Sequence, residues 1–445
     1  MKQRVKHKII GKITMLIIVL LILSMLTPVM IAEKKPKKII NVSIRKEKPP
    51  HIIHITAVDS YDYGYKIGKI MGSFIKKLYL ISYLLNNENE REITEYSTKQ
   101  ITYLKNYFPH ELEELQGLSD SLNIKIEKLI YLKKIWNSFN FNQCTVTLSS
   151  VNATKYNETF LTQNFDFNLL NIHSYFFYFL WRFYSYKLWV IKINTMRYKY
   201  AFFGIPLLRE VTVLNEKGLA HGGNGIQFNS NTSQPIDEGE GMSLVSLRRL
   251  TIMTCKNVTE AVTLCKNTPR ESSRTDGIMT AVYCDKEGGL AVIEQTHSYF
   301  VSFYGNSTDM TDSYENILWH TNHFQWLDPN LTGSVKPEDV PDSMIRYQRC
   351  KELLEENYGN ITLDVCKHIC RDHGGGTNKD KKDSSDICVH PDKNSTSSTC
   401  FSYIVKPDNL TVYFTHGSPC RCSYVCRNLT EEFEKEYPFF DYLLY

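Results

Sequence analysis

The first 143 residues of this 445-residue chain contain no cysteine, whereas twelve cysteines follow and seven of them lie after residue 360. The sequence also lacks a basic stripe beyond its first fifty residues, and its net charge is only +4. Proteins that bind nucleic acid usually carry such a basic stripe or patch. No nucleic-acid partner is therefore expected.

Motifs for a nucleotide or a metal cofactor are absent as well, so no cofactor and no metal are expected. The residues that come nearest to a metal-binding set are Cys366, His368, Cys370, His373, Cys388 and His390. Their spacings match no familiar zinc finger. In an exported chain the C-terminal cysteines are expected to form disulfides of undetermined connectivity, and a zinc cluster is the alternative.

An apolar stretch without charges, Ile13 to Ala32, follows a basic flank that ends at Lys12. Such a stretch is long enough to cross a bilayer as a helix, and a cleaved signal peptide is the alternative. Residues 1–32 are thus interpreted as a signal anchor or signal peptide, and residues 33–50 as a charged linker. Both interpretations place the rest of the chain outside the cell or in the lumen of the secretory pathway. As an anchor, the N-terminal helix would hold the chain to the membrane as a single-pass protein; after cleavage, the chain would be secreted.

N-x-[ST] sequons support this compartment, because they are acceptor sites for glycans in exported proteins. They begin at Asn41, Asn152, Asn157, Asn231, Asn257, Asn306, Asn330, Asn360, Asn394, Asn409 and Asn428. Their spread along the chain predicts a glycoprotein with these residues in exposed loops.

Hydrophobic periodicity divides the remaining chain at Cys144. Apolar residues recur at three- and four-residue spacing from Tyr61 to Leu132, so residues 51–143 are predicted to be helical. Residues 144–419 are predicted to hold the sheets, and residues 420–445 to form a cysteine-containing tail. The predicted hairpins cover 144–167, 210–228 and 277–296, the helices 242–254, 259–265, 343–356 and 363–371, and two closing strands 400–405 and 410–415. This order favours an α+β domain with sheets packed face to face between helical layers.

Two short runs at the start of the sheet region suggest chemistry: CTVT at 144–147 and QNFDF at 163–167. A lone cysteine is most often a buried structural residue. These runs, however, resemble the penicillin acyltransferase family of N-terminal nucleophile hydrolases, whose members begin with Cys-Thr and carry a Gln-Asn-aromatic-Asp box on the next strand. Further runs match in the same order: GYKIG at 64–68, ELQGL at 114–118, HTNH at 320–323 and SMIRYQR at 343–349. The resemblance covers residues 60 to 415.

This resemblance implies a four-layer αββα sandwich of the N-terminal nucleophile hydrolase type. It also implies that the Cys144 thiol breaks the Gln143–Cys144 bond, which would separate a small chain, residues 51–143, from a large chain that begins at Cys144. The freed α-amine of Cys144, with an ordinary pKa of about 8, suits a base near neutral pH. No catalytic histidine is then required, whereas a papain-like enzyme would need one.

The family pattern assigns roles to individual residues. Asp166 matches the acidic partner of the new amino terminus, and Asn322 matches the asparagine that stabilises the oxyanion. Asn164, Asn224 and Arg346 are further candidates for oxyanion or substrate binding.

Two features near these residues need a separate interpretation. His320 and His323 flank Asn322 and are interpreted as framing it, since no third metal ligand is apparent. At 395–399 this chain reads STSST, where the fungal acyltransferase has an Arg-Gly-Ala-Thr run. The candidates to replace the missing arginine are Arg346, Arg349 and Lys393.

The expected activity is hydrolysis or transfer of the acyl group of a small N-acylated substrate, with acyl-coenzyme A as a further candidate. One alternative is a lipid-amide hydrolase similar to acid ceramidase, in which an arginine commonly stands three residues before the acid; here Gln163 holds that place. The other alternative is an inactive surface glycoprotein that retains the fold. The intact set of Cys144, Asp166 and Asn322 argues against inactivity.

Overall fold

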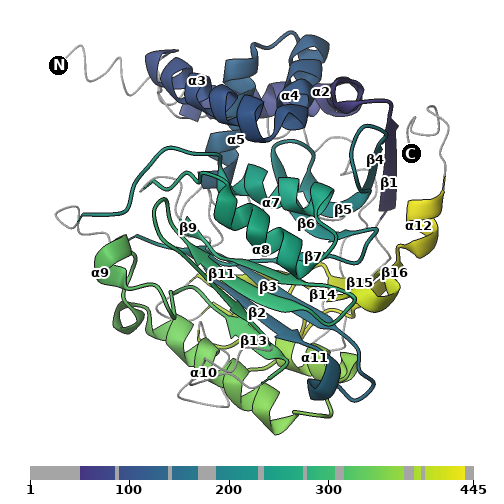
Figure 1. Cartoon of the computed structure of the whole chain (residues 1–445), viewed down its shortest axis with the longest axis vertical. Helices are drawn as coiled ribbons and strands as arrows, with labels where there is room; N and C mark the ends of the chain where they lie inside the picture. Colours follow the sequence, from purple (N-terminus) through teal and green to yellow (C-terminus); the bar gives the residue numbers. More distant parts are fainter. Residues whose placement is uncertain are drawn as a thin grey trace, which may run out of the picture.

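The computed structural model describes residues 51–85, 90–138, 143–168, 187–228, 235–273, 278–305, 315–374, 385–391 and 396–435 (Figure 1). The predicted N-terminal helix and the linker lie outside these residues. Within the described ranges, no helix combines the length and the apolar character that a membrane span requires.

Four helices gather at one end of the molecule (Figure 1): α2 (Ser60–Leu85), α3 (Glu90–Tyr107), α4 (Pro109–Leu122) and α5 (Ile126–Ser138). This agrees with the helical periodicity of the sequence. Helices α2 and α4 cross at two glycines, Gly64 and Gly117. A Cβ atom on Gly64 would lie 1.8 Å from the Glu114 carbonyl oxygen, so the backbones touch where GYKIG meets ELQGL.

The larger sheet has eight strands in the order β1-β4-β5-β6-β7-β10-β11-β12. Its strands are β1 (His51–Ala57), β4 (Lys187–Ile193), β5 (Tyr200–Ile205), β6 (Arg209–Asn215), β7 (Ala220–Gly222), β10 (Ala281–Cys284), β11 (Leu290–Gln295) and β12 (Phe300–Tyr304). Strand β1 was not predicted, because residues 51–143 were expected to be helical. It pairs in parallel with β4, so the N-terminal segment is built into the sheet.

The smaller sheet has six strands in the order β13-β2-β3-β14-β15-β16. Its strands are β13 (Ile317–His320), β2 (Gln143–Ser149), β3 (Phe160–Asn168), β14 (Ser397–Lys406), β15 (Thr411–Thr415) and β16 (Val425–Asn428). Strands β2 and β3 form the predicted antiparallel hairpin, in which Cys144 lies opposite Phe165 and Gln143 lies opposite Asp166. A separate short pair joins β8 (Gly225–Ile226) to β9 (Ile278–Met279).

The two sheets face each other and are covered by helices on their outer sides (Figure 1). Helices α7 (Leu244–Thr254) and α8 (Val258–Asn267) lie on the larger sheet, and α10 (Pro341–Glu356) and α11 (Leu363–Cys370) lie on the smaller one. Aromatic rings join the sheets: Phe203 of β5 packs edge-on against Phe401 of β14 at 5.0 Å between centroids. The predicted α+β class with two packed sheets is confirmed.

The predicted tail at 420–445 differs from the structure. Strand β16 pairs with β15 along the edge of the smaller sheet, and helix α12 (Thr430–Glu434) follows it. The residues of this segment up to 435 therefore belong to the folded domain. A short helix, α9 (Pro329–Thr332), completes the elements named in Figure 1.

The disulfides expected among the C-terminal cysteines are not formed. All twelve cysteines lie in the described part of the chain, and none is bonded to another. Their placement explains the difference: Cys366 and Cys370 pack in the hydrophobic core beneath α11, and Cys388 and Cys420 lie beside two histidines.

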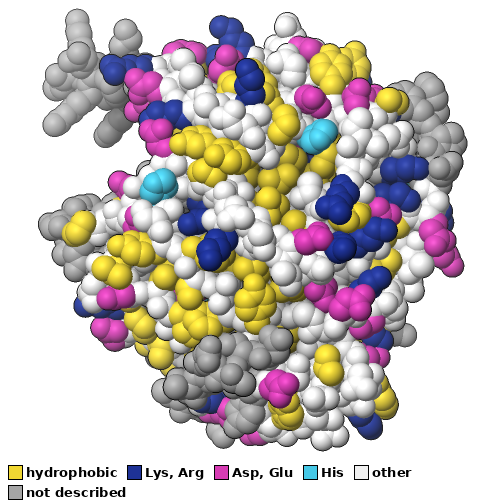
Figure 2. Space-filling view, in the orientation of Figure 1, with side chains coloured by type: hydrophobic (Ala, Val, Ile, Leu, Met, Phe, Trp, Pro, Cys, Tyr) yellow, Lys and Arg dark blue, Asp and Glu magenta, His cyan; other side chains and the backbone are white. Residues whose placement is uncertain are grey.

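Most of the sequons within the described residues lie at the protein surface. The asparagines of six of these sequons are exposed: Asn152, Asn157, Asn330, Asn360, Asn409 and Asn428. Asn257 is half-buried and caps helix α8 with its side chain. On the face drawn in Figure 2, acidic and basic side chains are interspersed.

Candidate active site around Cys144

Cys144 is the second residue of strand β2, and it is 1% exposed. Its backbone N–H donates a hydrogen bond to Asn322 Oδ1 at 2.7 Å. Asn322 follows strand β13 and is fixed by Ser343 in the first turn of α10, because its own N–H donates to Ser343 Oγ at 2.7 Å. His323 Nδ1 also lies 2.7 Å from that oxygen, so the histidine helps to frame Asn322.

Arg346 joins these groups from helix α10. Its side chain is fully buried. Nη1 donates to the Cys144 carbonyl oxygen at 2.6 Å and to Thr145 Oγ1 at 2.9 Å. Nη2 donates to Asn322 Oδ1 at 2.9 Å. The Arg346 guanidinium therefore fixes the Cys144 carbonyl group. It also fixes Asn322 Oδ1, the oxygen that accepts the hydrogen bond from the Cys144 nitrogen.

Asp166 lies on the neighbouring strand β3 and is fully buried. Thr399 Oγ1 of strand β14 donates to Asp166 Oδ1 at 2.5 Å, while Asp166 Oδ2 is buried without a hydrogen-bond partner. Burial raises the pKa of Asp166 to about 7, although the Arg346 charge and the Thr399 hydrogen bond oppose this shift. A carboxyl group with this pKa exchanges protons near neutral pH.

The Cys144 thiol holds its proton firmly. Burial, followed by the Asp166 charge, raises the pKa of the thiol to about 12. Arg346 and hydrogen bonds from the backbone of Asp166 and Gly225 oppose the shift. Since the thiolate is the reactive form, Cys144 needs a neighbouring base to act as a nucleophile.

The other two predicted asparagines have different surroundings. Asn224 is buried, with Nδ2 3.3 Å from His320 Nδ1 and Oδ1 accepting from Gln163 Nε2 at 3.3 Å. Asn164 donates from Nδ2 to the carbonyl oxygens of Cys370 and Ile387, both at 2.9 Å. The structure thus uses Asn164 to tie strand β3 to the segment after α11, and its donors do not point toward Cys144.

Asn322 contacts three neighbours through its side-chain amide. Its Nδ2 donates to the Gly225 carbonyl oxygen at 2.8 Å, and its Oδ1 accepts from Cys144 and Arg346. The side chain therefore positions the Cys144 nitrogen. The backbone N–H of Gly225 hydrogen-bonds the Cys144 sulfur, a contact that residue types alone did not reveal.

Among the candidates for the missing arginine, only Arg346 reaches the Cys144 group. Arg349 pairs with Asp372 at 2.9 Å and with Glu352 at 3.0 Å. Lys393 lies outside the described residues. Burial also lowers the pKa of Arg209 to about 10 and lowers that of Arg248, and the nearby Cys144 sulfur opposes both shifts. Two arginines that the sequence did not single out therefore interact electrostatically with the thiol.

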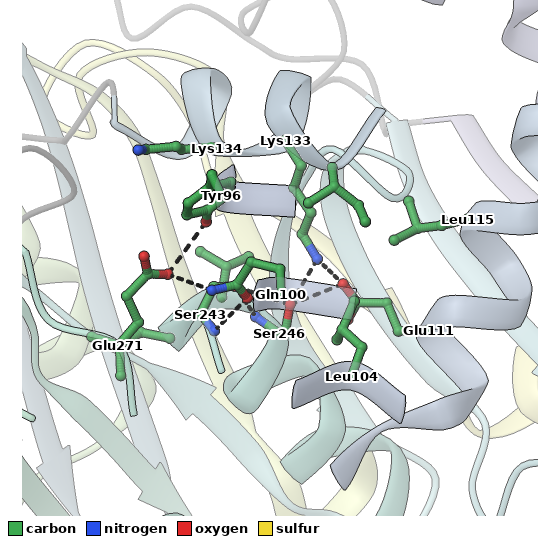
Figure 3. A pocket seen from close by; sticks show the side chains of 13 residues that line it. Tyr96, Gln100, Leu104, Glu111, Leu115, Lys133, Lys134, Ser243, Ser246 and Glu271 are labelled. Carbon is green, nitrogen blue, oxygen red and sulfur yellow. Dashed lines mark hydrogen bonds and ion pairs between the residues drawn. The ribbon is translucent and has the colours of Figure 1, made fainter. Parts of the chain in front are cut away.

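Figure 3 shows a pocket formed by other residues, between α3, α4, α5 and the start of α7. Lys133 of α5 forms an ion pair with Glu111 of α4 and donates to Ser246 Oγ at 2.9 Å. Ser246 Oγ in turn donates to Glu111 at 2.9 Å. The charges of Lys133 and Glu111 offset each other. The contacts of this pocket join the N-terminal helices to α7, and no residue of the Cys144 group lines it.

Among curated proteins no match was found. Among solved structures, penicillin V acylase from Agrobacterium tumefaciens is 13% identical, with a TM-score of 0.37 and coverage of 61% of this chain and 83% of that chain. A mutant of the conjugated bile acid hydrolase from Clostridium perfringens is 14% identical, with a TM-score of 0.39 and coverage of 64% and 93%.

The family comparison is more extensive. The family described as acyl-coenzyme A:6-aminopenicillanic acid acyl-transferase matches residues 153–421, which is more than half of the chain. The matched segment includes Asp166, Asn224, Asn322 and Arg346 and begins after Cys144. The chain belongs to this acyl-transferase family.

Proposed function

We propose that this chain is an amide hydrolase or acyltransferase of the N-terminal nucleophile type that cuts its own Gln143–Cys144 bond. The observation that carries the proposal is the hydrogen bond from the Cys144 backbone nitrogen to Asn322 Oδ1, with Arg346 bound to that same oxygen. A strand residue with only a packing role does not require a side-chain amide at its peptide nitrogen and a buried guanidinium that fixes this amide. Both fit a nitrogen that becomes a functional amine.

The self-cleavage step begins at the buried thiol. The Cys144 sulfur attacks the carbonyl carbon of Gln143, the C–N bond breaks, and the thiol proton ends on the nitrogen, which becomes the α-amine. Asp166, with a pKa of about 7, is suited to carry this proton between the two atoms. Water then hydrolyses the thioester, which leaves a carboxylate on Gln143 and restores the thiol.

In the processed enzyme, the same groups serve the catalytic cycle. The α-amine accepts the thiol proton, the sulfur attacks the substrate amide, and the proton then passes to the leaving amine. Arg346 disfavours a second positive charge and so keeps the amine neutral, while Asp166 stabilises it when protonated. The backbone N–H of Gly225 is placed to stabilise the oxyanion beside the sulfur. Water or an acceptor amine removes the acyl group.

The charge near the sulfur favours a substrate that carries an acid group. Burial lowers the pKa of Arg248 of α7 and of Arg209 of β6, the Arg248 charge adds to the shift of Arg209, and both side chains interact with Cys144. Arg248 Nε is buried without a hydrogen-bond partner. A carboxylate on the substrate would pair with Arg248 and offset part of this positive charge. An N-acyl amino acid has both the amide and the carboxylate.

The lipid-amide alternative receives no comparable support. Gln163, which replaces the expected arginine, donates to the Gly223 carbonyl oxygen at 2.9 Å and accepts from the Gly223 N–H at 2.9 Å. Its amide therefore braces strand β3 against the turn after β7. An exported and glycosylated state, either anchored in the membrane or secreted, remains part of the proposal. The apolar N-terminal stretch and the exposed sequons support it.

Mass spectrometry of the full chain after purification tests self-cleavage. The wild type is expected to give two fragments, of which the second begins at Cys144. Cys144→Ala is expected to remain whole, and Cys284→Ala, which changes another buried cysteine, is expected to be cut normally. An intact wild-type chain would overturn the proposal.

A second measurement examines the enzyme activity. The processed enzyme is incubated with a set of N-acyl amino acids and with their methyl esters, and the acyl group is sought on the large chain. The expected result is a thioester on Cys144 that forms faster with the free acids. A normally cut protein that never acquires an acyl group would contradict the proposed catalysis while leaving self-cleavage intact.

A further inference from the structure

Four side chains with metal-binding atoms meet outside the Cys144 group. They are His373, Cys388, His390 and Cys420, and their ligand atoms all lie within 4.8 Å of one another. They come from three separate segments: one follows α11, one lies at 385–391, and one lies between β15 and β16. Cys388 and His390 are buried, and the other two are half-buried.

The separations between His390 Nε2 and the other three ligand atoms fit a tetrahedral metal shell. His390 Nε2 lies 3.1 Å from His373 Nε2, 3.6 Å from Cys388 Sγ and 3.3 Å from Cys420 Sγ. With Zn–S bonds of about 2.3 Å and Zn–N bonds of about 2.0–2.1 Å, the ligand atoms of a tetrahedral site are separated by roughly 3.3–3.8 Å. The observed separations agree with this shell to within a few tenths of an ångström.

We propose that His373, Cys388, His390 and Cys420 bind a structural zinc ion. Two thiolates and two imidazoles are the donor set of closed, four-coordinate zinc sites, and no position remains for a reacting water. The site therefore has a structural role. The zinc alternative weighed from the sequence included His373, Cys388 and His390 but missed Cys420, which is distant along the chain, and no finger motif fits the spacings.

The zinc ion would stabilise the segment around Val389, which contacts Asp166 through Thr399. The ligands Cys388 and His390 flank Val389, whose N–H donates to Thr399 Oγ1 at 2.8 Å. Thr399 N–H donates back to the Val389 carbonyl oxygen at 3.0 Å, and Thr399 Oγ1 donates to Asp166. The ion thus fixes a segment without regular structure that orients the threonine bound to Asp166.

A disulfide between Cys388 and Cys420 is the competing chemistry, since their sulfur atoms are within 4.8 Å. Disulfide formation releases two electrons and two protons to an oxidant and removes two of the four ligands. The zinc ion keeps both sulfurs as thiolates. Metal content and the count of free thiols therefore distinguish the two states.

The test measures zinc in the full chain, purified without chelators, by elemental mass spectrometry. The wild type is expected to carry about one zinc ion per chain. Cys388→Ser and His390→Ala are expected to lose most of it, whereas Cys426→Ser, which changes an exposed cysteine, is expected to retain it. Zinc-free wild-type protein, a Cys388–Cys420 disulfide in its peptide map, or full zinc content in Cys388→Ser would overturn the proposal.

A conservative variant keeps the test decisive if the loss variants fail to fold. His390→Cys offers a Cys3His set, which also binds zinc. It is expected to fold with about one metal ion per chain, and its cobalt form is expected to show stronger sulfur-to-metal absorption than the cobalt form of the wild type. Unchanged absorption in His390→Cys would show that residue 390 is not a ligand and would overturn the site.

Discussion

At the scale of single residues, Arg346 has the most contacts around the proposed nucleophile. It donates to the Cys144 carbonyl oxygen, to Thr145 Oγ1 and to Asn322 Oδ1. A lysine retains the charge but cannot make these directed hydrogen bonds at once. Arg346→Lys is therefore expected to slow self-cleavage by about 10- to 100-fold, since a hydrogen bond to a charged group contributes roughly 1.5–3 kcal/mol. The measurement is the fraction of cut chain over time after synthesis.

Arg349→Lys is the matched control, because Arg349 lies on the same helix and pairs with Asp372 and Glu352 instead. It is expected to be cut at the wild-type rate. Equal slowing in both variants would mean that the effect comes from loss of helix stability and not from the contacts at Cys144.

Asp166 leads to a prediction about pH. Its pKa is raised from the usual 3.8 to about 7, chiefly by burial. Between these values the folded chain holds a proton that the unfolded chain has lost, so the free energy of unfolding falls as pH rises through this window. Asp166→Asn removes this pH-dependent decrease in the free energy of unfolding, because asparagine does not titrate.

The comparison uses Cys144→Ala as the background, so that no chain is cut. The gain in unfolding free energy from Asp166→Asn is expected to grow between pH 4 and pH 7, on the order of 4 kcal/mol in total, and to stay level above pH 7. Urea unfolding at several pH values measures this difference. A gain that does not change with pH would show that the folded-state pKa of Asp166 is not raised.

The residues of the candidate site were predicted to different extents. Cys144, Asp166, Asn322 and Arg346 lie in motifs that resemble a family, and the structure brings them together from positions up to 202 residues apart. Thr399 and the backbone N–H of Gly225 were missed. A backbone donor has no residue-type signal, and a threonine hydroxyl acquires its role only through strand pairing.

At the scale of elements, the close crossing of α2 and α4 depends on glycine. A Cβ atom on Gly117 would lie 2.0 Å from the Tyr61 carbonyl oxygen and 2.8 Å from the Tyr65 nitrogen. Because both are backbone atoms, Gly117→Ala must push the helices apart. The expected loss of stability is at least 1–3 kcal/mol, roughly the cost of overpacking a core, despite the better helix propensity of alanine. Urea unfolding measures it.

Gly72→Ala provides the control on helix α2. Its nearest neighbour within 4 Å is the end of the Leu122 side chain, at 2.9 Å, which can move. This variant is expected to stay within about 1 kcal/mol of the wild type. Equal losses from both substitutions would count against the close crossing.

Local patterns predicted the hairpins and most helices, but not every strand. The β2–β3 hairpin shows alternation on both strands and a polar connection between them, so its pairing is visible in the sequence. Strand β1 pairs with β4, more than 130 residues away. The partner of such a parallel strand is set by the global fold, and a short apolar run before a long helix does not indicate it.

At the scale of the whole molecule, the proposed cut would leave two chains that are joined only by non-covalent contacts. Strand β1 of the small chain pairs with β4 of the large chain along its full length. Buried Arg249 of α7 adds a second link, since it pairs with Glu114 of α4 and with Glu210 of β6. The two chains are therefore expected to elute together in native size-exclusion chromatography and to separate only in denaturant.

Arg249→Met tests this link, because it leaves the Glu114 and Glu210 carboxylates buried without their cation. Removal of one partner from a buried ion pair costs roughly 3–5 kcal/mol. The two chains of this variant are expected to separate at a clearly lower urea concentration than those of the wild type. Arg91→Met removes an ion pair with Glu95 whose side chains are 85% and 56% exposed, and it is expected to change little. If the two variants separate at the same urea concentration, the sheet pairing of β1 and the helix packing hold the cut protein together without help from Arg249.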